Sequence, residues 1–306
     1  MPDFWVWRYA LKAAGGVNAK TEREVYEGAL IRVGEGFGCV HPWPELGDAS
    51  LDECLHDLGG RAEMALVQQS LKCAEADGAA RMEGRSLFEG LVVPRSHAIL
   101  PFCDEEAVAQ AVARGFTHVK VKAGREVRSE LEMLRSLIAK WPELRWRIDF
   151  NEMGEVEELK TLFGEWGDEE KGAVDFLEDP VRYDGGDWKE LREATGLALA
   201  NDRHVNEERG DSDVLVVKPA LHEMPVSGQR RVVTSYLDHP LGQVFAAWEA
   251  ARAGIEECCG LQTQKIFQQS EFTERLGEAK PELIVPSGAG LGFGDLLEKL
   301  PWVKYS

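Results

Sequence analysis

Three acidic residues in the middle of the chain lie at the ends of apolar segments, where they could bind a cation together. Asp149 lies in RWRIDF, Glu178 in VDFLEDP and Asp202 directly after LALAN. One such residue alone is more often a helix or turn cap. Three carboxylates on three consecutive strands stay ionised together only when a cation neutralises them. Oxygen ligands without cysteine or histidine predict Mg²⁺, with Mn²⁺ able to substitute.

Lysines on two other segments could move a proton. Lys120 and Lys122 alternate with valines in HVKVK, so both project from one face of a strand. In a barrel strand the valines would face the helices and the lysines the interior. A buried lysine beside a divalent cation has a lowered pKa and can act as a base. Lys218 ends VLVVK and could contact the opposite face of a substrate, although a strand-end lysine can also simply extend to solvent.

Further residues are predicted to support the site. Arg147 and Asn151 share the face of Asp149 and are expected to support its carboxylate, with Asn151 also contacting substrate. The glycine-rich segment Pro286–Gly294 follows no βαβ unit, so a dinucleotide site is rejected. Its closely spaced glycines would instead let backbone N–H groups approach a substrate carboxylate at Ser287 and Gly288, unless it is an ordinary loop.

Periodicity predicts the elements that position these residues. Before residue 95, strands Phe4–Ala10 and Val25–Val33 and helices Leu51–Leu58 and Ala62–Ala76 indicate an α+β domain. After it, apolar strands alternate with helices, and about eight such units favour a closed (β/α) barrel. The fold class is therefore α/β, a modified (β/α) barrel with an N-terminal α+β capping domain. We expect the cap at 1–94 and the barrel at 95–306, with the C-terminal segment packing back on the cap.

The predicted strands of the barrel, in chain order, are Ala98–Phe102, His118–Lys122, Trp146–Phe150, Val174–Leu177, Leu197–Ala200, Val214–Lys218, Arg231–Tyr236 and Cys258–Thr263. The stronger helices between them are Glu105–Arg114, Val127–Lys140, Val156–Trp166, Trp188–Ala194 and Gln243–Ala253.

Composition excludes several classes of protein. The chain has 306 residues, 44% of them hydrophobic, and a formal net charge of -19, which disfavours nucleic acid as a partner. No apolar run approaches the ~20 residues of a membrane span, and the N-terminus does not read as a signal peptide. Six cysteines without metal-site spacing are expected to be reduced thiols, so the cytoplasm is the expected location.

Together these motifs resemble the muconate-lactonising subgroup of the enolase superfamily over nearly the whole chain. The KxK pair matches Lys120 and Lys122, the metal ligands match DFN, EDP and ANDR, and the lysine of the sixth strand matches VVKP. The resemblance implies a capping domain whose loops, here Ala13–Glu24 and Trp43–Leu51, set specificity. One departure is Arg203, because the subgroup usually has an acid directly after the third ligand.

Within the subgroup, TSYLDHPLGQ, which contains Ser235, GLQT and VPSGAGLGFG are similar to the o-succinylbenzoate synthase family. This implies a lyase of menaquinone biosynthesis that dehydrates 2-succinyl-6-hydroxy-2,4-cyclohexadiene-1-carboxylate through a metal-stabilised enediolate. Lys122 would remove the alpha proton and return it to the leaving hydroxide. Lys120 would keep the pKa of Lys122 low, and Lys218 would contact the ring by a cation–π interaction. The only implied partner is the small-molecule carboxylate, with Ser235 among its contacts.

Two kinds of alternative stay open. N-succinylamino acid racemase, dipeptide epimerase and muconate cycloisomerase share the same metal and lysine set. A non-catalytic barrel is disfavoured, because a protein without activity would not retain so many costly buried charges. The sequence does not indicate an oligomeric state.

Overall fold

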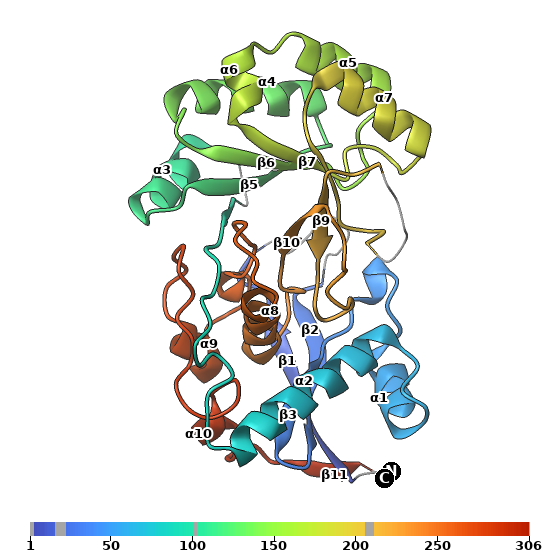
Figure 1. Ribbon diagram of the computed structural model, residues 1–306, viewed down its shortest axis with the longest axis vertical. Coiled ribbons are helices and arrows are strands. Elements are labelled where there is room, and N and C mark those ends of the chain that lie inside the picture. Colours follow the sequence, from blue (N-terminus) through green and yellow to red (C-terminus); the bar gives the residue numbers. More distant parts are fainter. Residues whose placement is uncertain (1–2, 16–22, 101–102, 206–210, 306) are drawn as a thin grey trace.

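The computed structural model describes residues 3–15, 23–100, 103–205 and 211–305, and arranges them as two packed parts (Figure 1). The strands are β1 (Phe4–Lys12), β2 (Val25–Val33), β3 (Gly36–Val40), β4 (Ala98–Leu100), β5 (His118–Lys122), β6 (Arg145–Asp149), β7 (Val174–Glu178), β8 (Leu199–Asn201), β9 (Val214–Val217), β10 (Arg230–Val233) and β11 (Val303–Tyr305). The α-helices are α1 (Leu51–Gly59), α2 (Ala65–Met82), α3 (Glu105–Ala113), α4 (Val127–Lys140), α5 (Val156–Gly164), α6 (Asp168–Ala173), α7 (Gly185–Thr195), α8 (Pro240–Arg252), α9 (Glu271–Leu276) and α10 (Gly294–Leu297).

The first part is an antiparallel sheet in the order β11-β1-β2-β3, with α2 packed against β3. Glycines make this close packing possible. A Cβ atom at Gly36 would lie 1.8 Å from the carbonyl oxygen of Ala74, and one at Gly38 would lie 2.2 Å from that of Ser70. No other residue type fits at these two positions, because the helix backbone occupies the space of a side chain.

The second part is a parallel sheet of seven strands in the order β10-β9-β8-β7-β6-β5-β4, each strand beside the next in the chain. Two parallel bridges, Ser96–Cys259 and Thr234–Gly260, join its two ends through one segment. The N–H of His97 donates to the carbonyl of Cys259 at 2.8 Å, and that of Gly260 to Val233 at 2.8 Å. This segment takes the eighth position of a (β/α) barrel, and the predicted fold class is confirmed.

Helices α4 to α7 cover the outer side of β5 to β7 at the top of the molecule (Figure 1). Val119 and Val121 of β5 are buried and pack in one hydrophobic cluster with Leu131 and Leu134 of α4. The valines therefore face the helices, and the intervening lysines face the barrel interior, as the period of two predicts.

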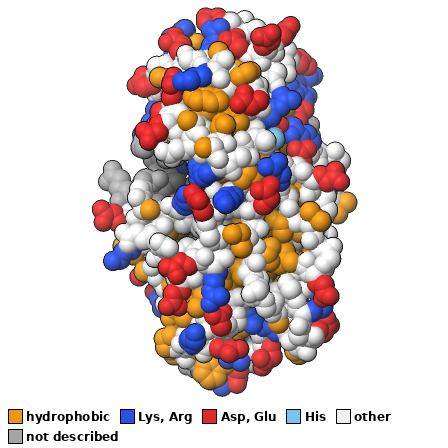
Figure 2. All heavy atoms as spheres, turned by 90° about the vertical axis from the view of Figure 1, so that its left-hand side faces the viewer, with side chains coloured by type: hydrophobic (Ala, Val, Ile, Leu, Met, Phe, Trp, Pro, Cys, Tyr) orange, Lys and Arg blue, Asp and Glu red, His pale blue; other side chains and the backbone are white. Residues whose placement is uncertain are grey.

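The surface mixes both signs of charge. On the face that Figure 2 shows, acidic and basic side chains are interspersed, and apolar side chains gather mainly in the lower half. The net charge of -19 is thus not concentrated there into one acidic field. None of the helices within the described residues is both long and apolar enough to cross a membrane.

Candidate active site

The register of the parallel sheet aligns the candidate residues at the carboxyl ends of its strands. Lys122 of β5 pairs with Asp149 of β6, Asp149 pairs with Glu178 of β7, and Glu178 pairs with Ala200 of β8. Asp202 lies two residues beyond Ala200. One lysine and three acids on four adjacent strands therefore meet at the same mouth of the barrel.

Lys120 lies one layer deeper and bridges two of the acids. Its Nζ is 2.9 Å from Asp149 Oδ2 and donates to Glu178 Oε1 at 2.7 Å. Burial disfavours the Lys120 ammonium, but Asp149 and Glu178 outweigh this effect and raise the pKa of Lys120. Burial raises the pKa of Glu178 to about 7, against the opposing charge of Lys120. Lys120 is therefore a permanent cation in this arrangement and not a base.

Asp202 and Lys218 form a second charged pair across the mouth. Lys218 Nζ lies 2.5 Å from Asp202 Oδ2, and it also lies 5.9 Å from the centre of the Tyr236 ring. Burial disfavours the Asp202 carboxylate, but Lys218 lowers the pKa of Asp202 overall. The other oxygen of Asp202, Oδ1, is buried and has no hydrogen-bond partner among the residues that the structure describes. An unpartnered carboxylate oxygen of this kind fits the coordination of a cation.

Lys122 differs from Lys120 in its surroundings. The residue is exposed at the end of β5, yet the protein atoms around its ammonium partly desolvate it and lower the pKa of Lys122. Asp149 opposes this effect, and the charge of Lys120 reinforces it. A lowered pKa increases the share of the neutral amine, which is the form of lysine that can accept a proton.

The oxygen-only donor set of Asp149, Glu178 and Asp202 suits Mg²⁺ chemically. In the described residues, no group of three such side chains is gathered ready to hold a metal ion. Lysine ammonium groups pair with the acids instead, Lys120 with the first two and Lys218 with the third. All three acids thus lie close to lysine ammonium groups, and the unpartnered Asp202 Oδ1 is suited to bind a metal cation in addition.

The predicted supporting residues have different surroundings. The backbone N–H of Asn151 donates to Asp149 Oδ1 at 3.1 Å. Ser235 follows β10 at the mouth, where its hydroxyl is buried and hydrogen-bonded to Thr263 Oγ1 at 2.7 Å. Arg147, expected to support Asp149, instead donates from Nε to Asp175 Oδ2 at 2.7 Å and from Nη1 to the carbonyl of Cys258. That expectation was wrong, because the guanidinium of Arg147 binds the carboxylate of Asp175 and the carbonyl of Cys258 instead.

The glycine-rich segment is tied to α2. Leu291 N–H donates to Asp77 Oδ1 at 2.7 Å, and Arg81 Nη2 donates to the carbonyl of Gly292 at 2.8 Å. Ser287 and Gly288 are exposed beside this tie. These contacts give the segment a structural role, and substrate contact at Ser287 and Gly288 stays a prediction.

Sequence reasoning missed a link between the cap and the mouth. Trp43 Nε1 donates to the carbonyl of Tyr236 at 2.9 Å, and Tyr236 Oη donates to Asp48 Oδ2 at 2.8 Å. Trp43 and Asp48 belong to the predicted specificity loop Trp43–Leu51, so this loop contacts the barrel directly. The other predicted loop, Ala13–Glu24, lies mostly at 16–22, outside the described residues. The contact of this loop with Tyr236 was not predictable, because no local sequence pattern encodes it.

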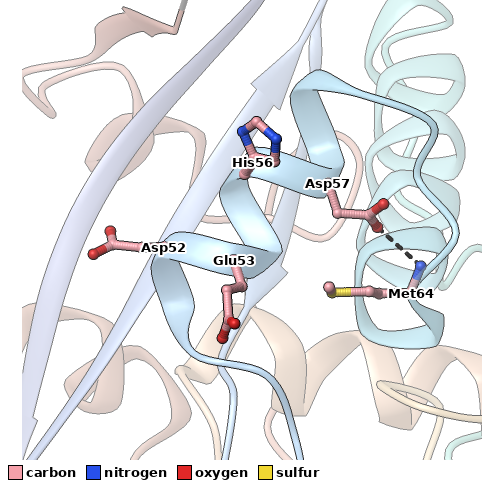
Figure 3. A pocket seen from close by; sticks show the side chains of 5 residues that line it. All are labelled: Asp52, Glu53, His56, Asp57 and Met64. Atoms are coloured by element: carbon pink, nitrogen blue, oxygen red, sulfur yellow. Dashed lines mark hydrogen bonds between the residues drawn. The ribbon is translucent and has the colours of Figure 1, made fainter.

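A hollow of about 400 Å³ on the surface of α1 is not part of this site (Figure 3). The acidic side chains that line it form contacts within the protein. Asp57 accepts hydrogen bonds from the N–H groups of Glu63 and Met64, and Glu53 forms a capping box with Ser50. Asp52 pairs with Arg8. These contacts explain the acidic lining without a ligand.

Comparisons with known proteins agree with this arrangement. Residues 4–80 match the family described as O-succinylbenzoate synthase, N-terminal domain, and residues 104–216 match the family described as enolase C-terminal domain-like. An o-succinylbenzoate synthase of Bdellovibrio bacteriovorus is 30% identical over 97% of this chain and 96% of its own length.

Solved structures show the same fold. A mandelate racemase/muconate lactonizing protein from Herpetosiphon aurantiacus has a TM-score of 0.80 at 18% identity, covering 94% of this chain and 96% of that one. The L-Ala-D/L-Glu epimerase from Bacillus subtilis has a TM-score of 0.77 at 18% identity, covering 94% and 97%. The muconate lactonizing enzyme from Pseudomonas fluorescens has a TM-score of 0.77 at 15% identity, covering 94% and 95%.

Proposed function

The chain belongs to the o-succinylbenzoate synthases of the enolase superfamily and is a lyase, and from this premise we propose its substrate and the roles of its residues. The proposed reaction is the syn-dehydration of 2-succinyl-6-hydroxy-2,4-cyclohexadiene-1-carboxylate to o-succinylbenzoate, a step of menaquinone biosynthesis. The Bdellovibrio relative, named for this activity and matched over 97% of this chain, supports the choice of substrate.

Asp149, Glu178 and Asp202 would hold Mg²⁺, or Mn²⁺ in its place. The oxygen-only donor set, the alignment of Asp149 with Glu178 and the unpartnered Asp202 Oδ1 support this assignment. When bound, the metal would supply positive charge next to the ring carboxylate, where negative charge develops as the alpha proton leaves. Lys120, paired with Asp149 and Glu178, would hold these two carboxylates in place, and its charge opposes the rise that burial causes in the pKa of Glu178.

Lys122 would carry the proton in both directions. As the neutral amine it takes the proton from the carbon alpha to the ring carboxylate. The carbon–oxygen bond to the ring hydroxyl then breaks, and the Lys122 ammonium returns the proton to the departing hydroxide, which leaves as water. One base suffices because both events occur on one face of the ring. The lowered pKa of Lys122 supports this role.

Lys218 would face the opposite side of the ring. Its pairing with Asp202 fixes its ammonium at the mouth, near the Tyr236 ring, where it could contact a π-system. Asn151 and Ser235 lie at the ends of β6 and β10 and are proposed as substrate contacts together with Ser287 and Gly288.

The proposed domains are a cap at 1–94 and a barrel at 95–306. Strand β11, at the end of the chain, pairs with β1 on the cap side.

The observation that carries the proposal is the register that places Lys122 beside Asp149 and Asp149 beside Glu178. The test is turnover of the purified chain with this substrate, with and without excess EDTA. We expect EDTA to abolish turnover and Mg²⁺ to restore it, and Asp149→Asn to lower it by at least about 100-fold with the fold retained. Full turnover in EDTA would refute the metal assignment.

A second function is favoured by one observation, the presence of a lysine on each side of the mouth. Lys122 and Lys218 could exchange a proton from opposite faces, as an N-succinylamino acid racemase or a dipeptide epimerase requires. Deuterium uptake into an N-succinyl amino acid would reveal this activity. If this uptake were efficient while dehydration was slow, the racemase function would replace the first proposal.

A further inference from the structure

Arg203 directly follows the proposed third metal ligand, at a position where the resemblance leads one to expect an acid. It contacts side chains from the two neighbouring strand-end loops. We propose that Arg203 is a positioning residue, whose guanidinium clamps the loops after β6 and β7 and thereby sets the affinity of the mouth for Mg²⁺. This inference rests on the proposed metal site and extends it to a residue that does not itself bind the ion.

The contacts of Arg203 reach three residues. Its Nη2 donates to Asn151 Oδ1 at 3.3 Å. Its Nε lies 3.5 Å from Glu152 Oε2 and 3.7 Å from Asp179 Oδ2. The side chain of Asp179 is only 3% exposed, so this pair is not an ordinary surface ion pair. A planar guanidinium can serve several oxygens at once, which a lysine ammonium cannot do with the same geometry.

The three partners of Arg203 have an unusual backbone. Asn151, Glu152 and Asp179 have φ angles of 50°, 64° and 40°, in the left-handed region that residues with a Cβ rarely adopt. Such conformations persist only where surrounding contacts hold them. All three bear side chains that contact Arg203, and the N–H of Glu152 also donates to the carbonyl of Asp179 at 2.7 Å. Arg203 is thus at the centre of the strained part of the mouth.

Two of the three strained residues, Asn151 and Asp179, are connected to proposed metal ligands. Asn151 N–H donates to Asp149 Oδ1 at 3.1 Å, and Asp179 Oδ1 accepts from the N–H of Asp202 at 3.1 Å. Asp179 is also the direct chain neighbour of Glu178. A shift of either loop would therefore move the carboxylates that must converge on the ion. Residues that orient metal ligands in this way commonly change metal affinity by about 10- to 100-fold when mutated.

The direction in which Mg²⁺ affinity changes when Arg203 is removed distinguishes a positioning role from charge repulsion. Arg203 is a cation near a cation site, so by Coulomb repulsion alone its removal would strengthen Mg²⁺ binding. If Arg203 acts by holding the loops, its removal weakens Mg²⁺ binding instead. Arg203→Lys keeps the charge but loses the planar fork, so positioning predicts an affinity between those of the wild type and Arg203→Ala.

The experiment is isothermal titration calorimetry of the full chain with Mg²⁺ alone, at one ionic strength. We expect Arg203→Ala to bind Mg²⁺ about 10- to 100-fold more weakly than the wild type and Arg203→Lys to lie between them. The matched control is Arg192→Ala, because Arg192 of α7 also pairs with an acid, Asp213, at 3.3 Å. That variant should bind as the wild type does. Circular dichroism establishes that each variant is folded, and Arg203→Lys carries the test should Arg203→Ala not fold.

Tighter or unchanged Mg²⁺ binding by Arg203→Ala, beside normal binding by the wild type, would overturn the role of Arg203 and leave the metal site standing. An equal loss in Arg192→Ala would also overturn it, because the effect would then be general. A wild-type chain that binds no Mg²⁺ would refute the proposed metal site, and the inference about Arg203 with it.

Discussion

Lys120 and Lys122 project from the same side of β5, only two residues apart, yet the protein gives them opposite properties. Two carboxylates surround Lys120 and raise its pKa. Lys122 has neighbouring protein atoms and the charge of Lys120 around it, and its pKa is lowered. The same residue type thus provides a fixed charge in one layer and a titratable amine in the next. The role of each lysine depends on its layer in the barrel more than on the KxK motif itself.

The first prediction separates the two lysines that face the proposed substrate. We expect Lys122→Ala to show no measurable dehydration, because no other side chain would take the alpha proton. Lys218→Arg keeps a cation that can contact a ring and should be impaired but active, whereas Lys218→Ala should be slower still. The measurement is the dehydration rate of each variant beside deuterium uptake into an N-succinyl amino acid. Dehydration by Lys122→Ala, with none by Lys218→Ala, would contradict the assignment of the base to Lys122 and would indicate Lys218 instead.

Among the elements, those with a strong local pattern were predicted to the residue. Strand Val25–Val33, strand His118–Lys122 and helix Val127–Lys140 have the predicted bounds. Strand β11 was missed because Val303–Tyr305 has no pattern of its own and is a strand only through its pairing with β1. The strand-end acids were predictable from barrel topology, since each lies at the end of an apolar strand. The contacts of Arg147 and Arg203 were not, because they depend on which residues of different elements meet in space.

The glycine-rich segment Pro286–Gly294 is held in place by one buried carboxylate, that of Asp77. Asp77 of α2 is fully buried and joins three segments. It accepts from the N–H of Phe37 at 3.1 Å, from that of Leu291 at 2.7 Å and from Arg81 Nε at 2.5 Å. One carboxylate thus connects β3, α2 and the chain that leads to α10. The close approach of the backbone to Asp77 therefore explains Gly290, since a Cβ at this position would lie 2.1 Å from Asp77 Oδ1.

The second prediction follows from this tie. Asp77→Ala would leave two buried N–H groups and Arg81 without their acceptor, and should lower the free energy of unfolding by about 3 kcal/mol. Urea denaturation measures the change. The matched control is Glu83→Ala, which removes an exposed acid paired with Arg85 just beyond α2 and should have no measurable effect. Equal stability of Asp77→Ala and the wild type would show that the tie contributes nothing.

At the scale of the whole molecule, the junction between the antiparallel sheet and the barrel is rich in buried polar rings. Tyr9 Oη lies 3.0 Å from His41 Nδ1, and the ring centres of Tyr9 and His239 are 4.8 Å apart. Burial lowers the pKa of His41 and that of His239 to about 3 each. Asp238 in the same region has its pKa raised to about 7 by burial. Burial at the junction therefore disfavours the charged forms of both histidines and of this acid, and the stability of the junction depends on pH in two opposite directions.

The last prediction isolates one of these contributions. The pKa of His41 is near 6.5 in the unfolded chain and about 3 in the folded one, so between these values only the unfolded state takes up the proton. Unfolding then becomes easier as pH falls, and stability that is fully present above pH 6.5 is lost on the way to pH 3. Asp238 acts in the opposite sense, since its raised pKa makes the folded state the better proton acceptor. The pH dependence of the wild type alone therefore does not reveal the contribution of His41.

We therefore compare the wild type with His41→Gln. Between pH 7 and pH 5 the free energy of unfolding should fall by about 2 kcal/mol more in the wild type, because a single shifted group of this size gives that difference. The measurement is urea denaturation of both proteins at the two pH values. An equal fall in both would mean that His41 becomes protonated inside the folded protein, and that the junction tolerates a charge where burial is expected to exclude one.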